Sequence, residues 1–229
     1  MKKKVIGEVP GNVFGMLADL NHKLQHGTLT PEELSLFLKR ENPFVQKGVE
    51  QMIAEWQELY LEDGIELDVS NLKIPEKKKG FDRLLVIAQG LKIQQAYDNC
   101  AKRFTCWKYT DRNLDEVVTE NDRDPANGAY AIWVRDRVEA DKELKNLSAN
   151  DLGRKEISGE TLLERFQHGL KYYKETDKHL DIENWTLCSG SRYADGDVPR
   201  VDWGGGEMHV NWCHPGDHEG YLRARAAVS

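Results

Sequence analysis

The sequence lacks an apolar run of the roughly 18 to 20 residues that a membrane-spanning helix needs. Cysteine is scarce: the 4 residues form no Cys-x-x-Cys pair, which excludes a disulfide scaffold and favours four reduced thiols. An excess of positive charge is also missing, because 32 Lys and Arg stand against 39 Asp and Glu, for a net charge of −7. Since a phosphate backbone attracts a basic surface, this acidic balance argues against a nucleic-acid partner.

The first residues also lack the apolar core of a secretion signal. Three lysines follow Met1, but Glu8, Pro10 and Asn12 interrupt the apolar stretch that a signal peptide requires. We therefore expect a cytoplasmic protein, with surface display left open through a route that carries no local signal.

The chain does contain enough apolar material for a core. Hydrophobic residues make up 39% of its 229 residues and charged residues 31%, a composition outside the disordered class. The length allows one ordinary domain with an appendage, or two small domains.

Residues 1–79 are predicted to form a helical segment. The stretch Thr30–Glu33 combines an N-cap threonine, a proline at the first helical position and a glutamate three residues after the cap. Apolar residues at helical spacing lie on either side of it, within 13–24 and 45–60. These patterns indicate three short helices.

The most linker-like stretch of the chain is Pro75–Gly80, which contains three consecutive lysines and which we interpret as a solvated hinge. We expect a domain boundary between residues 79 and 80. Three short helices with one apolar stripe each bury little surface alone, so we expect them to dock on the rest of the chain or on a second copy of it, as a homo-oligomer.

Residues 80–229 are predicted to form an α+β domain, because continuous apolar runs typical of buried strands alternate with helical patterns. The expected order is a strand at 84–88, a helix at 91–104, a polar loop at 111–127, a strand at 130–134, a helix at 161–173 and a strand-rich tail from Trp185.

The tail, residues 184–229, differs in composition from the rest of the chain. Lysine is absent after Lys178, and seven of the 19 glycines lie in this tail. Two stretches, Pro199–Trp203 and Met208–Cys213, alternate between apolar and polar residues with the period of a strand. The glycine-rich stretch 204–207 between them is predicted to form a hairpin turn.

This alternation predicts two faces with different roles. The apolar residues are expected to share a buried face: Val201, Trp203, Met208, Val210 and Trp212. The polar residues are expected to share the opposite, free face: Arg200, Asp202, His209, Asn211 and Cys213.

The residues of the free face and of the loops at 194–197 and 216–221 have an unusual relation to the genetic code. Apart from Glu207 and Glu219, all of them arise from changes at the adenines of an Asn codon that ends in a pyrimidine. Lys and Gln cannot arise in this way, and both are absent from residues 184–229.

Together with these features, several short motifs resemble the variable proteins of diversity-generating retroelements. They are Ser189–Tyr193, Val198–Pro199, the apolar residues Val201, Trp203, Val210 and Trp212, and the terminal stretch Leu222–Ser229. The helical front part and the region around 80–151 are also similar to proteins of uncultured bacteria. The resemblance implies a C-type-lectin-like domain at 80–229, two helices packed on mixed or antiparallel sheets, with a variable region at about 190–229.

The same resemblance implies a binding function without catalysis and without a cofactor, directed at a macromolecule, usually a protein. Neither an EPN nor a QPD motif is present, so no calcium site is expected. The residues implied to contact the ligand are Asp195, Asp197, Arg200, Asp202, His209, Asn211, Cys213, His214, Asp217, His218 and Tyr221. Of these, Arg200 and Tyr221 are the residue types that most often anchor protein interfaces.

An enzyme is the alternative hypothesis. Cys213-His214 and Asp217-His218 are zinc-competent residue types, and with Cys188 they suggest a metal- or cysteine-dependent site like that of formylglycine-generating enzymes. Pro215 and Gly216 disfavour a helix there, so the i, i+4 spacing of His214 and His218 does not place them on one helix face. The charged residues at 135–141 and the Asp195/Asp197 pair resemble a general acid and base, although such dense charge is usually a solvated surface.

Overall fold

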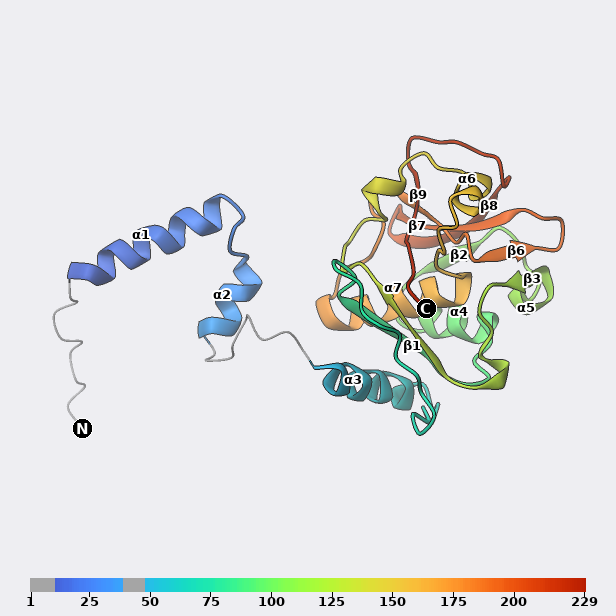
Figure 1. Ribbon diagram of the computed structural model, residues 1–229, viewed down its shortest axis with the longest axis horizontal. Helices are drawn as coiled ribbons and strands as arrows, with labels where there is room; N and C mark the ends of the chain where they lie inside the picture. The colour runs from blue at the N-terminus through green and yellow to red at the C-terminus, as the bar shows by residue number, and fades with distance from the viewer. Residues whose placement is uncertain (1–10, 39–47) are drawn as a thin grey trace. The chain divides into compact units, whose positions relative to one another are not determined.

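The computed structural model describes residues 11–38 and 48–229 (Figure 1). The chain divides into two compact units, and the boundary between them in the sequence lies between Gly48 and Val49. The first unit contains α1 (Gly11–Gln25) and α2 (Pro31–Leu38). The predicted helix start is confirmed: the Thr30 backbone N–H donates to Glu33 Oε2 at 2.7 Å, and the Glu33 N–H donates to Thr30 Oγ1 at 3.1 Å.

The third predicted helix, α3 (Val49–Glu62), belongs to the second unit; the part of its predicted stripe before Gly48 lies outside the described residues. The Trp56 indole N–H donates to the carbonyl oxygen of Leu84, and the Tyr60 hydroxyl donates to that of Val86, both at 2.9 Å. These bonds attach α3 to a central strand. The unit boundary therefore differs from the one expected between residues 79 and 80.

The stretch Pro75–Gly80, expected to be a hinge, lies within the second unit. The Trp133 indole N–H donates to the Pro75 carbonyl oxygen at 3.0 Å, and Lys77 pairs with Asp82 at 2.7 Å. Its lysines are exposed as expected, but Pro75 is bonded to the core residue Trp133, and Phe81, which follows the stretch, is buried.

The second unit is an α+β domain, as predicted. Strands β1 (Arg83–Ile87) and β4 (Tyr130–Val134) form an antiparallel pair. Helix α7 (Leu162–Thr176) contacts α4 (Ile93–Ala101), β1 and β7, so it lies between this pair and a larger sheet (Figure 1). It is buried continuously from Leu162 to Tyr172, as expected of a helix covered on all sides.

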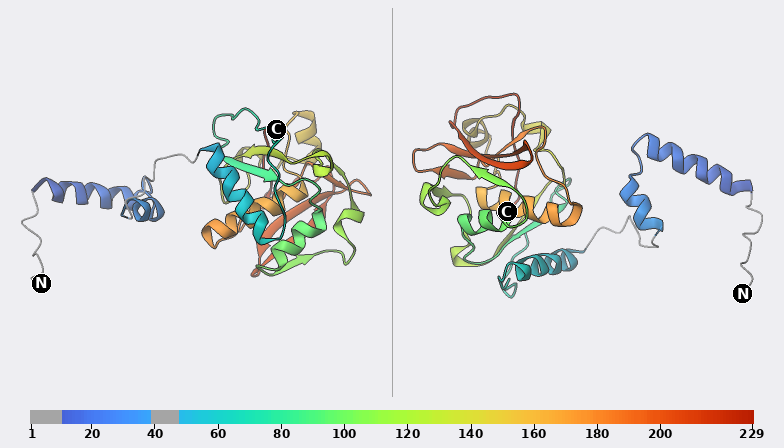
Figure 2. Two further views of the ribbon diagram at one scale, coloured as in Figure 1. Left: turned by 90° about the horizontal axis from the view of Figure 1, so that it is seen from below. Right: turned by 180° about the vertical axis from the view of Figure 1, so that it is seen from behind.

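The larger sheet has five strands in the order β2-β8-β7-β5-β9. Its C-terminal strands, drawn in red, are seen from two further directions in Figure 2. The bounds of the five strands are β2 Cys106–Lys108, β5 Trp185–Leu187, β7 Val198–Gly204, β8 Glu207–Cys213 and β9 Leu222–Ala224. Strands β7 and β8 form the predicted hairpin, while β2 pairs with β8 in parallel and β9 pairs with β5 in parallel. Short helices α6 (Ala149–Arg154) and η2 (Lys142–Leu144) complete the connections.

The region expected to be a polar loop, 111–127, contains regular structure. It forms α5 (Leu114–Val117), β3 (Val118–Asn121) and the 3-10 helix η1 (Pro125–Asn127). Strand β3 pairs with β6 (Ser191–Tyr193), about 70 residues away in the chain, and this distant partner explains why local polarity misled the prediction.

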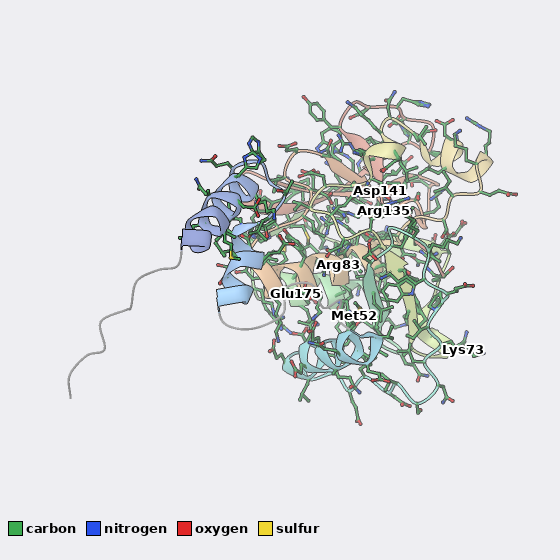
Figure 3. The ribbon with its side chains drawn as sticks, turned by 60° about the vertical axis from the view of Figure 1, so that its left-hand side comes forward. Met52, Lys73, Arg83, Arg135, Asp141 and Glu175 are labelled. Carbon is green, nitrogen blue, oxygen red and sulfur yellow. The ribbon has the colours of Figure 1, made fainter. Side chains whose placement is uncertain are left out.

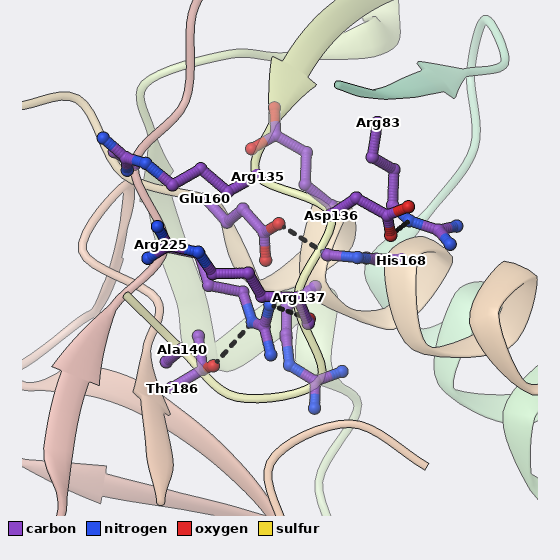
Figure 4. A network of polar contacts seen from close by, with 12 residues as sticks. Arg83, Arg135, Asp136, Arg137, Ala140, Glu160, His168, Thr186 and Arg225 are labelled. Atoms are coloured by element: carbon purple, nitrogen blue, oxygen red, sulfur yellow. Dashed lines mark hydrogen bonds and ion pairs between the residues drawn. The ribbon is translucent and has the colours of Figure 1, made fainter. Parts of the chain in front are cut away.

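A buried ionic cluster anchors the C-terminal segment. The Asp181 carboxylate, fully buried, accepts hydrogen bonds from Arg165 Nε at 2.9 Å, Arg225 Nη2 at 2.6 Å and Thr186 Oγ1 at 2.5 Å. Arg225 also donates to Thr186 Oγ1 at 3.1 Å (Figure 4). Beyond this cluster, Val228 pairs with Trp133 through two backbone bonds of 2.9 Å, which returns the chain to β4.

A second buried pair lies beside this cluster. His168 Nδ1 and Glu160 Oε1 are 2.8 Å apart, and neither residue is exposed (Figure 4). Burial raises the pKa of Glu160 to about 7 and lowers the pKa of His168 well below its usual value, so burial favours the uncharged form of both groups. Burial of this pair therefore favours a hydrogen bond between neutral groups over a salt bridge.

Among the described residues, no helix has the length and apolar character required to cross a bilayer.

Candidate ligand-binding face

The β7–β8 hairpin has the predicted turn and inner face. Gly204 pairs with Glu207, so Gly205 and Gly206 form a two-residue loop, and their φ angles of 61° and 89° are positive as a type I′ turn requires. The inner residues Val201, Met208 and Val210 are buried, and Trp203 packs partly buried against the core.

The outer face of the same hairpin forms a pocket of about 320 Å³. Four residues predicted to contact the ligand line it: Arg200 and Asp202 from β7, and His209 and Asn211 from β8. Its remaining walls are Trp107 from β2, Trp185 from β5 and Glu207 at the start of β8. The sheet order places β2 and β5 on the two sides of the hairpin, so an aromatic residue flanks the polar residues on each side.

Hydrogen bonds hold the imidazole of His209 in the pocket. Its Nδ1 lies 3.2 Å from Asp202 Oδ2, and its Nε2 lies 3.1 Å from Glu207 Oε1. The Trp107 ring meets it edge-on at a centroid distance of 5.9 Å. The two carboxylates lie at opposite nitrogens of one ring, so these three groups do not converge on a single metal ion.

The guanidinium of Arg200 is also fixed. Its Cζ lies 3.8 Å from the centroid of Trp185, its Nη1 lies 3.7 Å from Asp202 Oδ1, and its Nε donates to the Trp212 carbonyl oxygen at 3.3 Å. Tyr221, 62% exposed, also contacts Trp185, with ring centroids 5.9 Å apart. Five of the predicted contact residues therefore belong to one continuous surface.

A second group of predicted residues gathers in the loops beside the hairpin. His214 Nδ1 lies 2.8 Å from Asp197 Oδ1, and the His214 backbone N–H donates to Asp217 Oδ2 at 2.9 Å. The hydrogen bond that the His214 ring makes to the Asp197 carboxylate raises the pKa of His214. Asp195 Oδ1 in turn accepts from the Asp197 backbone N–H at 3.1 Å. This group is an exposed loop network next to the pocket.

Two residues at the far end of the hairpin correct the prediction. Trp212, expected in the core, is 41% exposed, whereas Cys213, expected on the free face, is only 5% exposed. The strand register continues unbroken to the Val198–Cys213 pair, so the alternation itself is intact. Strand β6 contacts β7 here, and the Tyr193 hydroxyl donates to the Asn211 carbonyl oxygen at 3.3 Å. This neighbouring strand covers the end of the outer face and removes Cys213 from the candidate contacts.

The residues of the zinc hypothesis are not brought together. His214 pairs with Asp197, while His218 Nε2 lies 2.6 Å from Asp151 Oδ2 on α6. Across residues 11–38 and 48–229, no group of three or more His, Cys, Asp or Glu side chains is placed to hold a metal ion. His218 thus lies outside both the pocket and any metal cluster in the described chain.

The cysteine hypothesis and the acid–base hypothesis at 135–141 also receive no support from the structure. All four cysteines are free thiols, as expected, but burial raises the pKa of Cys213 to about 12 and that of Cys188 well above its usual value. A thiol that stays protonated at neutral pH is a poor nucleophile and a poor metal ligand. Asp141, expected on a solvated surface, is buried and lies 2.5 Å from Arg135 (Figure 3), so this pair stabilises structure.

Three pocket residues escaped the sequence analysis. In the sequence, Trp185 marks only the start of the strand-rich tail, Glu207 is an exception to the codon pattern, and no motif singles out Trp107. Trp107 enters the site because β2 pairs in parallel with β8, which sets it opposite His209. No local pattern in the sequence carries this pairing.

The comparisons with known proteins are negative: no family model, no curated protein and no solved structure matches this chain.

Proposed function

We propose that the protein is a ligand-binding protein that displays an exchangeable surface on a fixed C-type-lectin-like scaffold, diversified by a retroelement, and that it is not an enzyme. The observation that carries this proposal is that the β7–β8 hairpin has one buried apolar face and one polar face that lines a pocket. Arg200, Asp202, His209 and Asn211 line a pocket, while Val201, Met208 and Val210, which alternate with them, are buried in the core. Side chains on the outer face therefore change without disturbing the packing of the inner face.

The scaffold part of the proposal is supported by α4 and α7 packed on each other and by the return of the C-terminal segment to β4. The motifs that carry the resemblance have structural tasks in this arrangement. Gly190 approaches the Gly159 carbonyl so closely that a Cβ atom would lie 2.9 Å from its oxygen, and Arg225 ties the terminal stretch to Asp181. Such residues have to stay constant while the surface varies.

A protein is the ligand class that the exposed surface fits best. Trp107, 44% exposed, lines one side of the pocket, and Tyr221, 62% exposed, lies against Trp185 on the other side. Large exposed aromatic residues and arginine are enriched in protein interfaces and dominate their binding energy.

The exchange of several outer residues at once tests the proposal. The test variant replaces four residues together: Arg200, Asp202, His209 and Asn211. Each new residue is one that changes at the adenines of an Asn codon can produce. We expect this variant to melt within a few degrees of the parent protein. The inner control Met208→Ala is expected to lose about 2–5 kcal/mol, which lowers the Tm by roughly 4–20 °C. An outer variant that melts as low as the inner control would refute the proposal.

A genomic observation provides a second test. The proposal expects a near-copy of the DNA that encodes residues 190–229 beside a reverse transcriptase gene, with differences confined to adenines. A genome with the gene but without such a copy would contradict diversification by a retroelement.

A further inference from the structure

We propose that the pocket between Trp107 and Glu207 binds a cationic side chain, the guanidinium of Arg or the ammonium of Lys, presented by a protein partner. This inference rests on the proposed function and specifies the chemistry of its ligand. The pocket carries two carboxylates, Asp202 and Glu207, against one guanidinium, Arg200, and the chain as a whole has a net charge of −7.

The pocket already holds one cation in the manner that the proposal requires. Arg200 lies 3.8 Å from the ring centroid of Trp185 and 3.7 Å from an oxygen of Asp202. A tryptophan face and a carboxylate therefore form a cation-binding pair on the β5 side of the pocket. Such pairs gain both from the ring quadrupole and from charge attraction.

The opposite side of the pocket also carries a tryptophan and a carboxylate, and the side chain that contacts both is the imidazole of His209 rather than a Lys or Arg. Trp107 and Glu207 both line this side, and His209 connects them, because its ring meets Trp107 at 5.9 Å and its Nε2 lies 3.1 Å from Glu207. Among the cation–π contacts of residues 11–38 and 48–229, none falls on Trp107. The side chain of Glu207 is 35% exposed, so an incoming cation reaches its carboxylate from solvent.

The partner is a protein rather than a free cation because exposed aromatic residues surround the pocket. Tyr221, 62% exposed, lies against the Trp185 wall with ring centroids 5.9 Å apart, and Trp107 on the opposite wall is 44% exposed. These side chains extend the surface well beyond the size of one side chain, as a protein interface requires.

The experiment titrates the full chain with N-acetyl-arginine methylamide, which carries the cation, and with the citrulline analogue, which has nearly the same shape and no charge. The indole N–H signal of Trp107, assigned with Trp107→Phe, reports binding in a two-dimensional NMR spectrum. We expect a saturable shift with a Kd on the order of 1–10 mM for the arginine probe. The citrulline probe is expected to bind roughly two- to fivefold more weakly, and added salt is expected to weaken the arginine probe.

Two variants localise the effect. Glu207→Gln is expected to weaken the arginine probe roughly two- to fivefold, and Glu219→Gln, a matched change at an exposed loop carboxylate, is expected to leave it unchanged. Equal binding of the two probes, or a shift that a methyl glycoside produces and arginine does not, would overturn the inference.

Failure of the cation inference can be distinguished from failure of the proposed function. If the multiple outer variant melts like the parent protein and arginine still fails to bind, only the cation inference fails. If Glu207→Gln itself lowers the Tm as much as Met208→Ala does, the outer face is structural and the proposed function fails with it.

Discussion

Loss of the Asp181 charge should destabilise this protein more than almost any other single polar change. Asp181 is fully buried between Arg165 and Arg225, each of which is only 2% exposed. Burial opposes the charge of Asp181, but Arg225 and Arg165 outweigh it and hold the pKa of the carboxyl below its usual value. The Asp181→Asn substitution keeps the size of the side chain and removes the charge that compensates two buried guanidinium groups.

The expected cost follows from these contacts. The removal of one partner from a buried ion pair costs about 3–5 kcal/mol, because the other charge remains in the interior without compensation. For a chain of this length that cost corresponds to a fall in Tm of roughly 6–20 °C. Arg225 carries the terminal segment, so we also expect faster proteolysis of that segment in the variant. Calorimetry and a limited-digestion time course measure the two effects.

Asp136→Asn is the matched control. Asp136 pairs with Arg83 at 2.8 Å, as Asp181 pairs with its arginines, but its side chain is 56% exposed. Exposed pairs contribute about 0–1 kcal/mol, so the Tm of this variant is expected to change by at most roughly 4 °C. If the two variants lose similar amounts of stability, the buried cluster does not stabilise the protein as proposed and the reasoning fails.

Three further predictions concern the same domain. Burial raises the pKa of Glu160 from 4.5 to about 7 in the folded protein. The protonated group therefore contributes its full stabilisation below pH 4.5, and this stabilisation is lost as the pH rises to 7. Urea titrations should therefore show the free energy of unfolding of the parent falling relative to that of Glu160→Gln as the pH rises from 4.5 to about 7; a difference that stays constant with pH would contradict this. Gly190→Ala, which brings a Cβ to 2.9 Å from a backbone oxygen, should lower the free energy of unfolding by about 1–3 kcal/mol in the same assay, and an unchanged value would show that the backbone yields. A thiol reagent should leave Cys100 and Cys188 unmodified in the native protein and label all four cysteines in urea, whereas fast native labelling of either residue would contradict its burial.

Local patterns in the sequence predicted most elements of the fold well. The capping signal at Thr30 located the start of α2, since Thr30 Oγ1 accepts a hydrogen bond from the Glu33 N–H. Continuous apolar runs located β1 and β4, because buried strands need no polar face. These signals work because each depends on residues within one turn or one strand.

Local patterns failed where a distant segment supplied the partner. The region 111–127 is polar, yet β3 forms there because β6 pairs with it. Helix α3 joins the second unit because Trp56 and Tyr60 find carbonyl partners on β1, more than twenty residues further along the chain. Neither partner is visible in a window of a few residues.

The sequence alone determined that the β7–β8 hairpin has an apolar side and a polar side, because successive side chains of a strand point in opposite directions whatever surrounds them. Only the tertiary structure decided what lies against each side. It brought Trp107 to His209 across about a hundred residues, placed Trp185 beneath Arg200, and covered Cys213 with β6 while it left Trp212 in solvent. The direction of a side chain is a local property of the backbone, whereas its burial depends on segments that reach it only when the whole chain has folded.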